Sequence, residues 1–189
     1  MMSTNKKRFN VYTICMVALL TAMMVLLSLT LSIRTPTFKL SFGSLPVVLG
    51  AMIFGPVEGA LVAIFGEFLV QLLTYGLVPT TIIWIIPPAI RALVIGAVVL
   101  YLRRNGGTPL ESRPVICYAT CIIGAILTTT GNTFGMWLDS LFYGTSFTPV
   151  LFITPARYVS GVITAVVVTT ACVPLMHMLR RSGVVKYTD

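Results

Sequence analysis

The chain has 189 residues, of which 57% are hydrophobic and only 10% carry a charge. Soluble domains average about 25% charged residues, so this chain lacks the polar side chains needed to cover a globular surface. We therefore expect an integral membrane protein, and we interpret the net charge of +8 as a signal of orientation in the bilayer rather than of nucleic-acid binding.

Apolar runs of about 20 residues, the length that crosses a bilayer as a helix, recur along the chain. The first run follows a basic segment and is too long for the apolar part of a signal peptide, so we interpret it as a membrane helix. The second run is short and ends at Gly55-Pro56. The sequence predicts one all-α membrane domain over residues 1–189, with helices at about 11–33, 45–54, 57–75, 82–102, 115–137 and 149–179.

Basic residues gather in alternate loops of this pattern, and the other loops carry little charge. Cytoplasmic loops of membrane proteins are enriched in Lys and Arg, so this side should face the cytoplasm. Both termini are then cytoplasmic, which agrees with an even number of helices. The residues that set this orientation are Lys6, Lys7, Arg8, Arg103, Arg104, Arg113, Arg180, Arg181 and Lys186.

Ionisable residues also lie deep inside three predicted helices. Glu67, Arg91 and Arg157 each lie about eight or nine residues from the outer end of their helix, which is roughly 12–14 Å. Gln71 lies one turn above Glu67, and Asn132 lies at roughly 8 Å. Charges at such depth cost about 2.5–3.5 kcal/mol and usually face a protein interior or a cavity.

Two interpretations of these charges are open. Glu67 can pair with Arg91 or Arg157 and simply hold helices together. One carboxylate cannot neutralise two guanidiniums, however, and arginine matches the geometry of carboxylates. We favour a cavity that opens outward and holds an anionic ligand.

Prolines and aromatic residues support such a cavity. Pro87, Pro88 and Pro155 lie just before the two arginines and should interrupt their helices, which is tolerated at membrane depth where a helix lines a cavity. Aromatic residues at the predicted outer ends form either an interfacial belt or a site for a flat ring. They are Tyr75, Trp84, Trp137, Phe142, Tyr143 and Phe147.

The sequence carries no Walker A, GxSxG, HExxH or kinase motif. The four cysteines lie in apolar runs and are interpreted as small hydrophobic residues, so we predict no metal and no cofactor. A binder without an energy source requires a partner. Ala18 and Ala22 place two small residues one turn apart, where another helix can approach closely.

The stretch LSIRTPTFKLSFGSLPVVLGAMIFGPVEGALVAIFGEFL, residues 31–69, resembles the S components of energy-coupling factor (ECF) vitamin transporters, most closely the folate-specific branch. Glu67 stands where the family usually has aspartate, and the segment around Arg91 is more charged than the folate pattern. Later matches to the folate branch are Asn132-Thr133, Trp137, Leu141-Phe142-Tyr143-Gly144 and Pro155-Ala156-Arg157.

This resemblance implies a six-helix S-component fold in a prokaryotic cytoplasmic membrane, with a vitamin pocket on the outer side. It also implies no enzymatic activity, and it implies partners: a transmembrane coupling (T) subunit and two cytoplasmic ATPase subunits. Ala18 and Ala22 would lie on the face that docks to the T subunit. The loaded S component is expected to topple in the membrane and to release its vitamin inside.

A folate-type vitamin fits this chemistry, because its glutamate tail is dianionic and its pterin ring donates N–H groups. Either Glu67 or Asp139 can accept from the ring. The predicted ligand-binding residues are Arg34, Lys39, Glu67, Gln71, Tyr75, Trp84, Arg91, Asn132, Trp137, Asp139, Tyr143 and Arg157. Three alternatives are an S component for another heteroaromatic or anionic vitamin, an intramembrane enzyme acting on a lipid, and an ion-coupled transporter that works alone.

Overall fold

The computed structural model describes residues 11–34, 39–106 and 109–183, without the side chains of residues 33–41 and 106. Within these ranges the chain forms six α-helices, one short antiparallel hairpin and a 3₁₀ turn at Leu110–Ser112. The hairpin joins β1 (Ser32–Arg34) to β2 (Lys39–Ser41). The helices are α1 (Val11–Thr30), α2 (Ser44–Ile53), α3 (Pro56–Tyr75), α4 (Thr81–Gly106), α5 (Pro114–Tyr143) and α6 (Thr148–Arg181).

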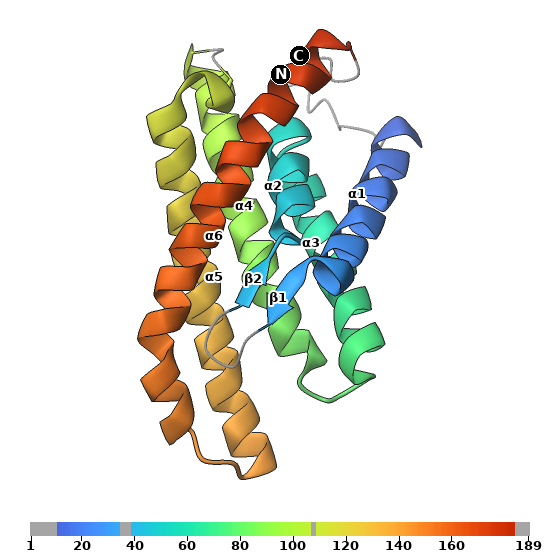
Figure 1. Ribbon diagram of the computed structural model, residues 1–189. Helices are drawn as coiled ribbons and strands as arrows, with labels where there is room; N and C mark the ends of the chain where they lie inside the picture. The colour runs from blue at the N-terminus through green and yellow to red at the C-terminus, as the bar shows by residue number, and fades with distance from the viewer. Residues whose placement is uncertain (1–10, 35–38, 107–108, 184–189) are drawn as a thin grey trace, which may run out of the picture.

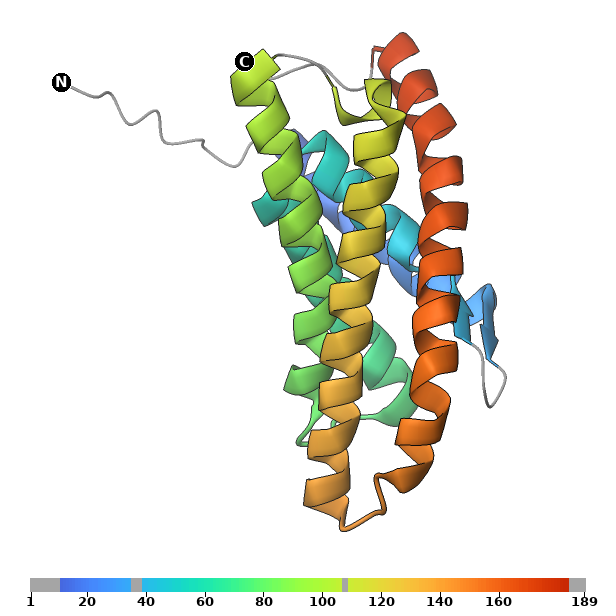
Figure 2. The ribbon, with the colours of Figure 1, turned by 90° about the vertical axis from the view of Figure 1, so that its left-hand side faces the viewer.

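The helices pack as a bundle in which α4, α5 and α6 stand side by side (Figure 2). α3 packs against α4 and against α1 and α2, and α6 returns to contact α2. α1 begins and α6 ends at the same end of the bundle (Figure 1), and α4 reaches that end through Arg103 and Arg104. By the distribution of basic residues we expect this end to face the cytoplasm, with the start of α1 and the end of α6 both on that side.

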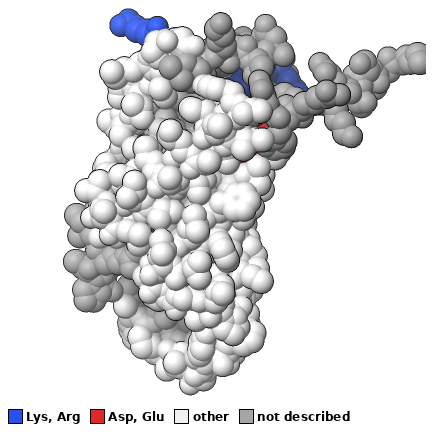
Figure 3. Space-filling model, turned by 90° about the vertical axis from the view of Figure 1, so that its right-hand side faces the viewer, with Lys and Arg blue, Asp and Glu red and all other residues white. Residues whose placement is uncertain are grey.

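The surface of the bundle is suited to lipid. Five helices are long and apolar enough to cross a membrane, and α2 is a shorter apolar helix of 10 residues. One face of the molecule is almost free of charged side chains below its cytoplasmic end (Figure 3). Exposed leucine, isoleucine and phenylalanine side chains occur along all five spanning helices. The predicted all-α membrane fold with a short second helix is thus confirmed.

α2 forms the centre of the core, because every residue from Pro46 to Ile53 is buried. Its end is set by Gly55, whose φ of 115° lies in a region that side chains rarely adopt, and Pro56 then begins α3 with a φ already suited to a helix. α3 approaches α2 closely at Gly59, where an added Cβ would lie 2.7 Å from the Cα of Ala51. The short helix is therefore held by backbone-to-backbone packing.

The first helix is shorter than the sequence predicted. α1 ends at Thr30 rather than near residue 33, and Ser32–Arg34 pairs with Lys39–Ser41 in the hairpin. Strand pairing then supplies backbone hydrogen bonds to residues that have left the helix.

The fifth helix is longer than predicted, because it continues past Trp137 to Tyr143. The prediction ended it where Asp139 interrupts the apolar run. In the structure the Asp139 carboxylate faces a cavity and accepts a hydrogen bond from the indole of Trp84, so it does not meet lipid. The charge therefore does not end the helix.

We expected the prolines to interrupt their helices, but the structure shows that they do not. α4 continues through Pro87 and Pro88, and α6 continues through Pro155 and Pro174. In α4 the hydroxyl of Thr128 on α5 lies 3.3 Å from the carbonyl oxygen of Pro87. The carbonyl oxygens that Pro87 and Pro88 leave without their usual helical donor belong to Ile83 and Trp84, so this contact joins α4 to α5 rather than replacing a lost bond.

Candidate functional site

The main cavity of the described structure has a volume of about 700 Å³ and lies in the outer half of the bundle. It is lined by side chains from α1, α2, α3, α4, α5 and α6, so every helix contributes a wall. Its outermost lining residues, Val78, Thr80 and Tyr143, lie in or beside the loops α3–α4 and α5–α6, opposite the cytoplasmic end. The cavity therefore lies where the polar residues of the sequence converge.

Nine of the twelve predicted ligand-binding residues line this cavity. They come from four helices, and they combine two arginines, two carboxylates, two amides and three aromatic rings. They are Glu67, Gln71, Tyr75, Trp84, Arg91, Asn132, Asp139, Tyr143 and Arg157.

Trp137 does not line the cavity, in contrast to the prediction. Its side chain is 40% exposed and packs against Phe134, with the two ring centroids 5.5 Å apart. Trp137 is two residues before Asp139, which places it on another face of α5. An aromatic pair on the outside of a membrane helix is expected from lipid contact alone. For Arg34 and Lys39, the structure gives the hairpin register, in which they are partners, but their side chains lie outside the described part.

Arg91 lies at the inner end of the cavity, and its position is fixed by α5. Its Nε donates to the Oγ1 of Thr128 (3.1 Å), and that hydroxyl donates to the carbonyl oxygen of Gly124 (2.7 Å). Gly124 leaves room for the arginine stem, because an added Cβ there would lie 3.2 Å from the Cγ of Arg91. The guanidinium is therefore held by its Nε edge. Its other two nitrogens form a planar fork that makes no hydrogen bond within the described residues.

Arg157 lines the cavity from α6 and contacts the Sδ of Met136 on α5. Neither Arg91 nor Arg157 makes an ion pair with a carboxylate in the described part of the chain. Glu67 accepts a hydrogen bond from Gln71 (3.1 Å) instead. The expectation that Glu67 pairs with one of these arginines only to hold helices together is therefore not what the structure shows.

Asp139 lies near the mouth of the cavity. Its Oδ2 accepts a hydrogen bond from the Nε1 of Trp84 (3.0 Å), which links the last turns of α5 to the first turn of α4. Its Oδ1 is buried and has no hydrogen-bond partner within the described residues. Buried polar atoms are nearly always paired, so this oxygen is an open acceptor in the cavity wall.

Several cavity residues were missed by the sequence analysis because they are small or apolar. Thr128 is one turn from Asn132, and Ser160 and Thr164 are one and two turns from Arg157. Their helical spacing from the predicted residues was the available signal, since residues three or four apart share a helix face. Hydroxyl groups are common in membrane helices, so that signal was not used.

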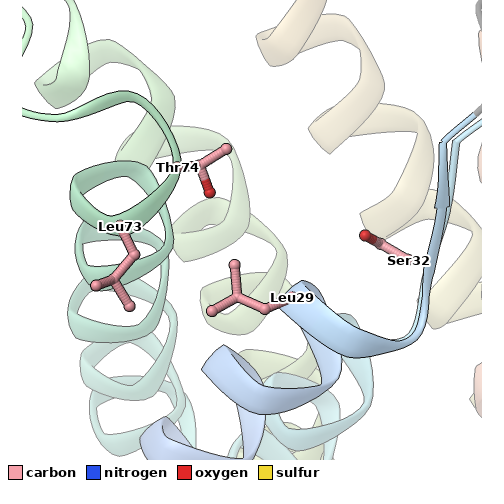
Figure 4. Close-up of a pocket in the computed structure, with 4 residues that line it drawn as sticks. All are labelled: Leu29, Ser32, Leu73 and Thr74. Carbon is pink, nitrogen blue, oxygen red and sulfur yellow. The ribbon is translucent and has the colours of Figure 1, made fainter.

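A second hollow of about 550 Å³ lies between the ends of α1 and α3, beside β1 (Figure 4). It is lined by Leu29, Ser32, Leu73 and Thr74, and it is shallow, with Leu29 and Leu73 both exposed. None of the predicted ligand-binding residues whose side chains the structure describes lines it. The main cavity is therefore the candidate binding site.

The chain is similar to one protein family over most of its length. The family model described as "ECF-type riboflavin transporter, S component" matches residues 8–181. No curated protein sequence matches the chain.

The fold is shared with solved S components, all below 25% sequence identity. "FolT bound with folic acid" has a TM-score of 0.62 and 21% identity, and the match covers 90% of this chain and 97% of that one. ThiT from Listeria monocytogenes has a TM-score of 0.62 and 18% identity, covering 85% of this chain and 92% of that one. The S component for biotin from an ECF-type ABC transporter has a TM-score of 0.54 and 16% identity, covering 90% and 94%.

The six-helix fold, the outward cavity and the nearly full-length family match agree with one another. They identify a multi-pass membrane protein that binds a small molecule and is not an enzyme. The chain belongs to the S-component family of ECF-type vitamin transporters.

Proposed function

We propose that this S component captures a folate-type vitamin on the outer side of a prokaryotic cytoplasmic membrane. It delivers the vitamin through a coupling module made of a T subunit and two ATPase subunits. The observation that carries the choice of vitamin is the pair Arg91 and Arg157, which line one cavity and have no carboxylate partner within the described residues.

The two arginines are available to an anionic ligand. Although Glu67 and Asp139 also line the cavity, neither Arg91 nor Arg157 makes an ion pair within the described residues, so a ligand carboxylate can pair with them. A charge at membrane depth costs about 2.5–3.5 kcal/mol, and a ligand carboxylate offsets that cost through charge-assisted hydrogen bonds. The glutamate tail of a folate carries two carboxylates for two arginines.

The remaining lining suits a flat heteroaromatic ring. Trp84, Tyr75 and Tyr143 supply aromatic surface, and Asn132 and Asp139 supply hydrogen-bonding groups at the same wall. Aromatic rings prefer to stack on one another with an offset, which favours a pterin over an aliphatic ligand. The volume of about 700 Å³ lies within the usual range for small-molecule sites.

The test measures the binding of folic acid to the purified chain in detergent by calorimetry. Arg91→Ala and Arg157→Ala should each weaken binding about 10- to 100-fold, since hydrogen bonds to a charged group contribute about 1.5–3 kcal/mol. Arg104→Ala, an exposed arginine at the cytoplasmic end, is the matched control and should bind like the parent. Unchanged affinity in both cavity variants would refute an anion site there.

Riboflavin is a second candidate, because the matching family model carries that name. Riboflavin has no anionic group at neutral pH, so it would leave both arginines without an ion-pair partner in the described part of the chain. Competition between folic acid, riboflavin, biotin and thiamine separates these candidates. If riboflavin displaces folic acid at equal concentrations, and folic acid does not displace riboflavin, the result would favour the flavin.

Ala18 and Ala22 are both exposed on α1, and we propose them as part of the surface that docks to the T subunit. Two small side chains one turn apart let a second helix approach closely in a membrane.

A further inference from the structure

The polar contacts of the cavity occur at successive depths along one face of α5. Thr128, Asn132, Met136 and Asp139 recur every three or four residues along it, and all four line the cavity. Thr128 contacts Arg91, Met136 contacts Arg157, and Asp139 contacts Trp84. α5 runs outward, so these contacts lie in that order from the floor of the cavity to its mouth.

The floor and the mouth of the cavity are farther apart than a single functional group of a ligand can reach. Thr128 and Asp139 are 11 residues apart in an unbroken helix, which is about 16 Å along its axis. α4 gives the same order in reverse, because Trp84 lies in its first turns and Arg91 two turns deeper. Two helices therefore agree that a cation lies at the floor and an acceptor at the mouth.

The floor is built to present a guanidinium fork. Thr128 engages the Nε of Arg91, and the side chain of Arg91 passes over Gly124. The two terminal nitrogens make no hydrogen bond within the described residues. A planar pair of N–H donors of this kind matches a carboxylate with two parallel hydrogen bonds.

The mouth is built to accept hydrogen bonds. Trp84 fixes one oxygen of Asp139, and the other oxygen is buried without a partner in the described chain. An unsatisfied buried acceptor is unfavourable, and a donor on a bound ligand would satisfy it. The Trp84 ring beside it offers a surface on which a flat ring can stack.

We propose that the ligand has two unlike ends and binds with its anionic end inward. A carboxylate contacts Arg91 at the floor, and an N–H-donating heteroaromatic ring contacts Asp139 and Trp84 at the mouth. This inference rests on the proposed function and adds the orientation of the vitamin and the residue that reads each end. Thr128 is a positioning residue, because it acts through Arg91.

The experiment pairs three ligands with two variants. The ligands are folic acid, folic acid with both glutamate carboxylates converted to amides, and folic acid lacking the 2-amino group of the pterin. Amidation should weaken binding to the parent about 10-fold or more, but should change binding to Arg91→Met less than about threefold. Removal of the amino group should weaken binding to the parent about 10-fold, but should change binding to Asp139→Asn very little.

The opposite pairing, in which Asp139→Asn removes the response to amidation and Arg91→Met removes the response to the missing amino group, would overturn the orientation while leaving folate binding intact. Fully additive losses would overturn both contacts. Failure of the parent to bind folic acid, with tight binding of another vitamin, would instead overturn the proposed function. The two failures are thus distinguishable.

A second variant guards against loss of fold. Thr128→Val keeps Arg91 but removes the hydrogen-bond partner of its Nε. This variant should bind folic acid severalfold more weakly than the parent, with little change in its affinity for the amide. Thr128→Ser should restore the affinity. Thr120→Val removes the same kind of backbone hydrogen bond, from Thr120 to the carbonyl oxygen of Ile116 (2.7 Å), away from the cavity, so it should bind both ligands like the parent. Equal losses for acid and amide in Thr128→Val would contradict the positioning role.

Discussion

Arg103 lies near the cytoplasmic end of α4, where its Nη2 donates to the carbonyl oxygens of Met52 (3.1 Å) and Ile53 (2.9 Å). These carbonyls end α2, and the last carbonyls of a helix have no partner within it. A cation at a helix C-terminus also interacts favourably with the helix dipole. The positive-inside pattern predicted that Arg103 lies at the same end as the start of the first helix and the end of the last, and the structure adds that this arginine also caps the buried short helix.

We therefore expect Arg103→Ala to lower the free energy of unfolding by about 1.5–3 kcal/mol, the range for hydrogen bonds to a charged group. The neighbouring Arg104 is exposed, and Arg104→Ala should change stability by less than about 0.5 kcal/mol. Thermal unfolding of both variants in the same detergent measures the difference. Equal stabilities would show that the cap contributes nothing.

At the scale of elements, the bundle depends on glycines that let helices approach. An added Cβ at Gly59 would lie 2.7–2.8 Å from the Cα, Cβ and N atoms of Ala51, so α3 and α2 touch backbone to backbone there. At Gly131 of α5 an added Cβ would lie 2.9 Å from the Cγ of Pro87. The cavity walls therefore have their spacing fixed by small residues below and beside the site.

Two Gly→Ala variants test this packing. Gly59→Ala should destabilise the fold by about 1–3 kcal/mol, because the added methyl group meets backbone that cannot move cheaply. Gly135→Ala is the matched control, since its Cβ would meet the Cγ2 of Ile83 at 3.4 Å and the Cε2 of Trp84 at 4.0 Å, both ordinary contacts. That variant should be neutral or gain up to about 1 kcal/mol from helix propensity. Similar melting temperatures for the two variants would contradict close α2–α3 packing.

At the scale of the whole molecule, the chain has a ligand cavity, and as an ECF S component it works with T and ATPase subunits. The cavity lies toward the outer end, while the exposed Ala18 and Ala22 lie on the first membrane helix. If Ala18 and Ala22 dock to the T subunit as proposed, capture of the vitamin and docking to the coupling module use different surfaces and can be separated by substitution.

The double variant Ala18→Leu, Ala22→Leu should bind folic acid like the parent but lose co-purification with the T and ATPase subunits. Larger side chains at this surface keep a partner helix from approaching. Ala119→Leu, at an exposed position of α5, is the control and should retain the complex. An intact complex in the double variant would place the docking surface elsewhere, and uptake into liposomes by the chain alone would remove the need for a partner.

Much of the site was predictable from the sequence because its signals are local or additive. Apolar runs and basic loops gave the spanning segments and their direction, and counting residues from each outer end placed Glu67, Arg91 and Arg157 at one depth. Asp139 was predicted as a site residue and also, incorrectly, as lying beyond the end of its helix. That error arose because hydropathy assigns a charge to water whether or not a cavity is present.

The sequence by itself determined that the chain is a helical membrane protein with its charged residues at a common level, because the cost of placing charge in lipid depends on residue type and depth. Only the tertiary structure decided which faces meet. Trp137 faces outward, Asp139 pairs with Trp84, and Arg91 is held by Thr128 rather than by Glu67. The rotation and register of each helix depend on close packing at residues such as Gly59 and Gly124, which no single segment encodes.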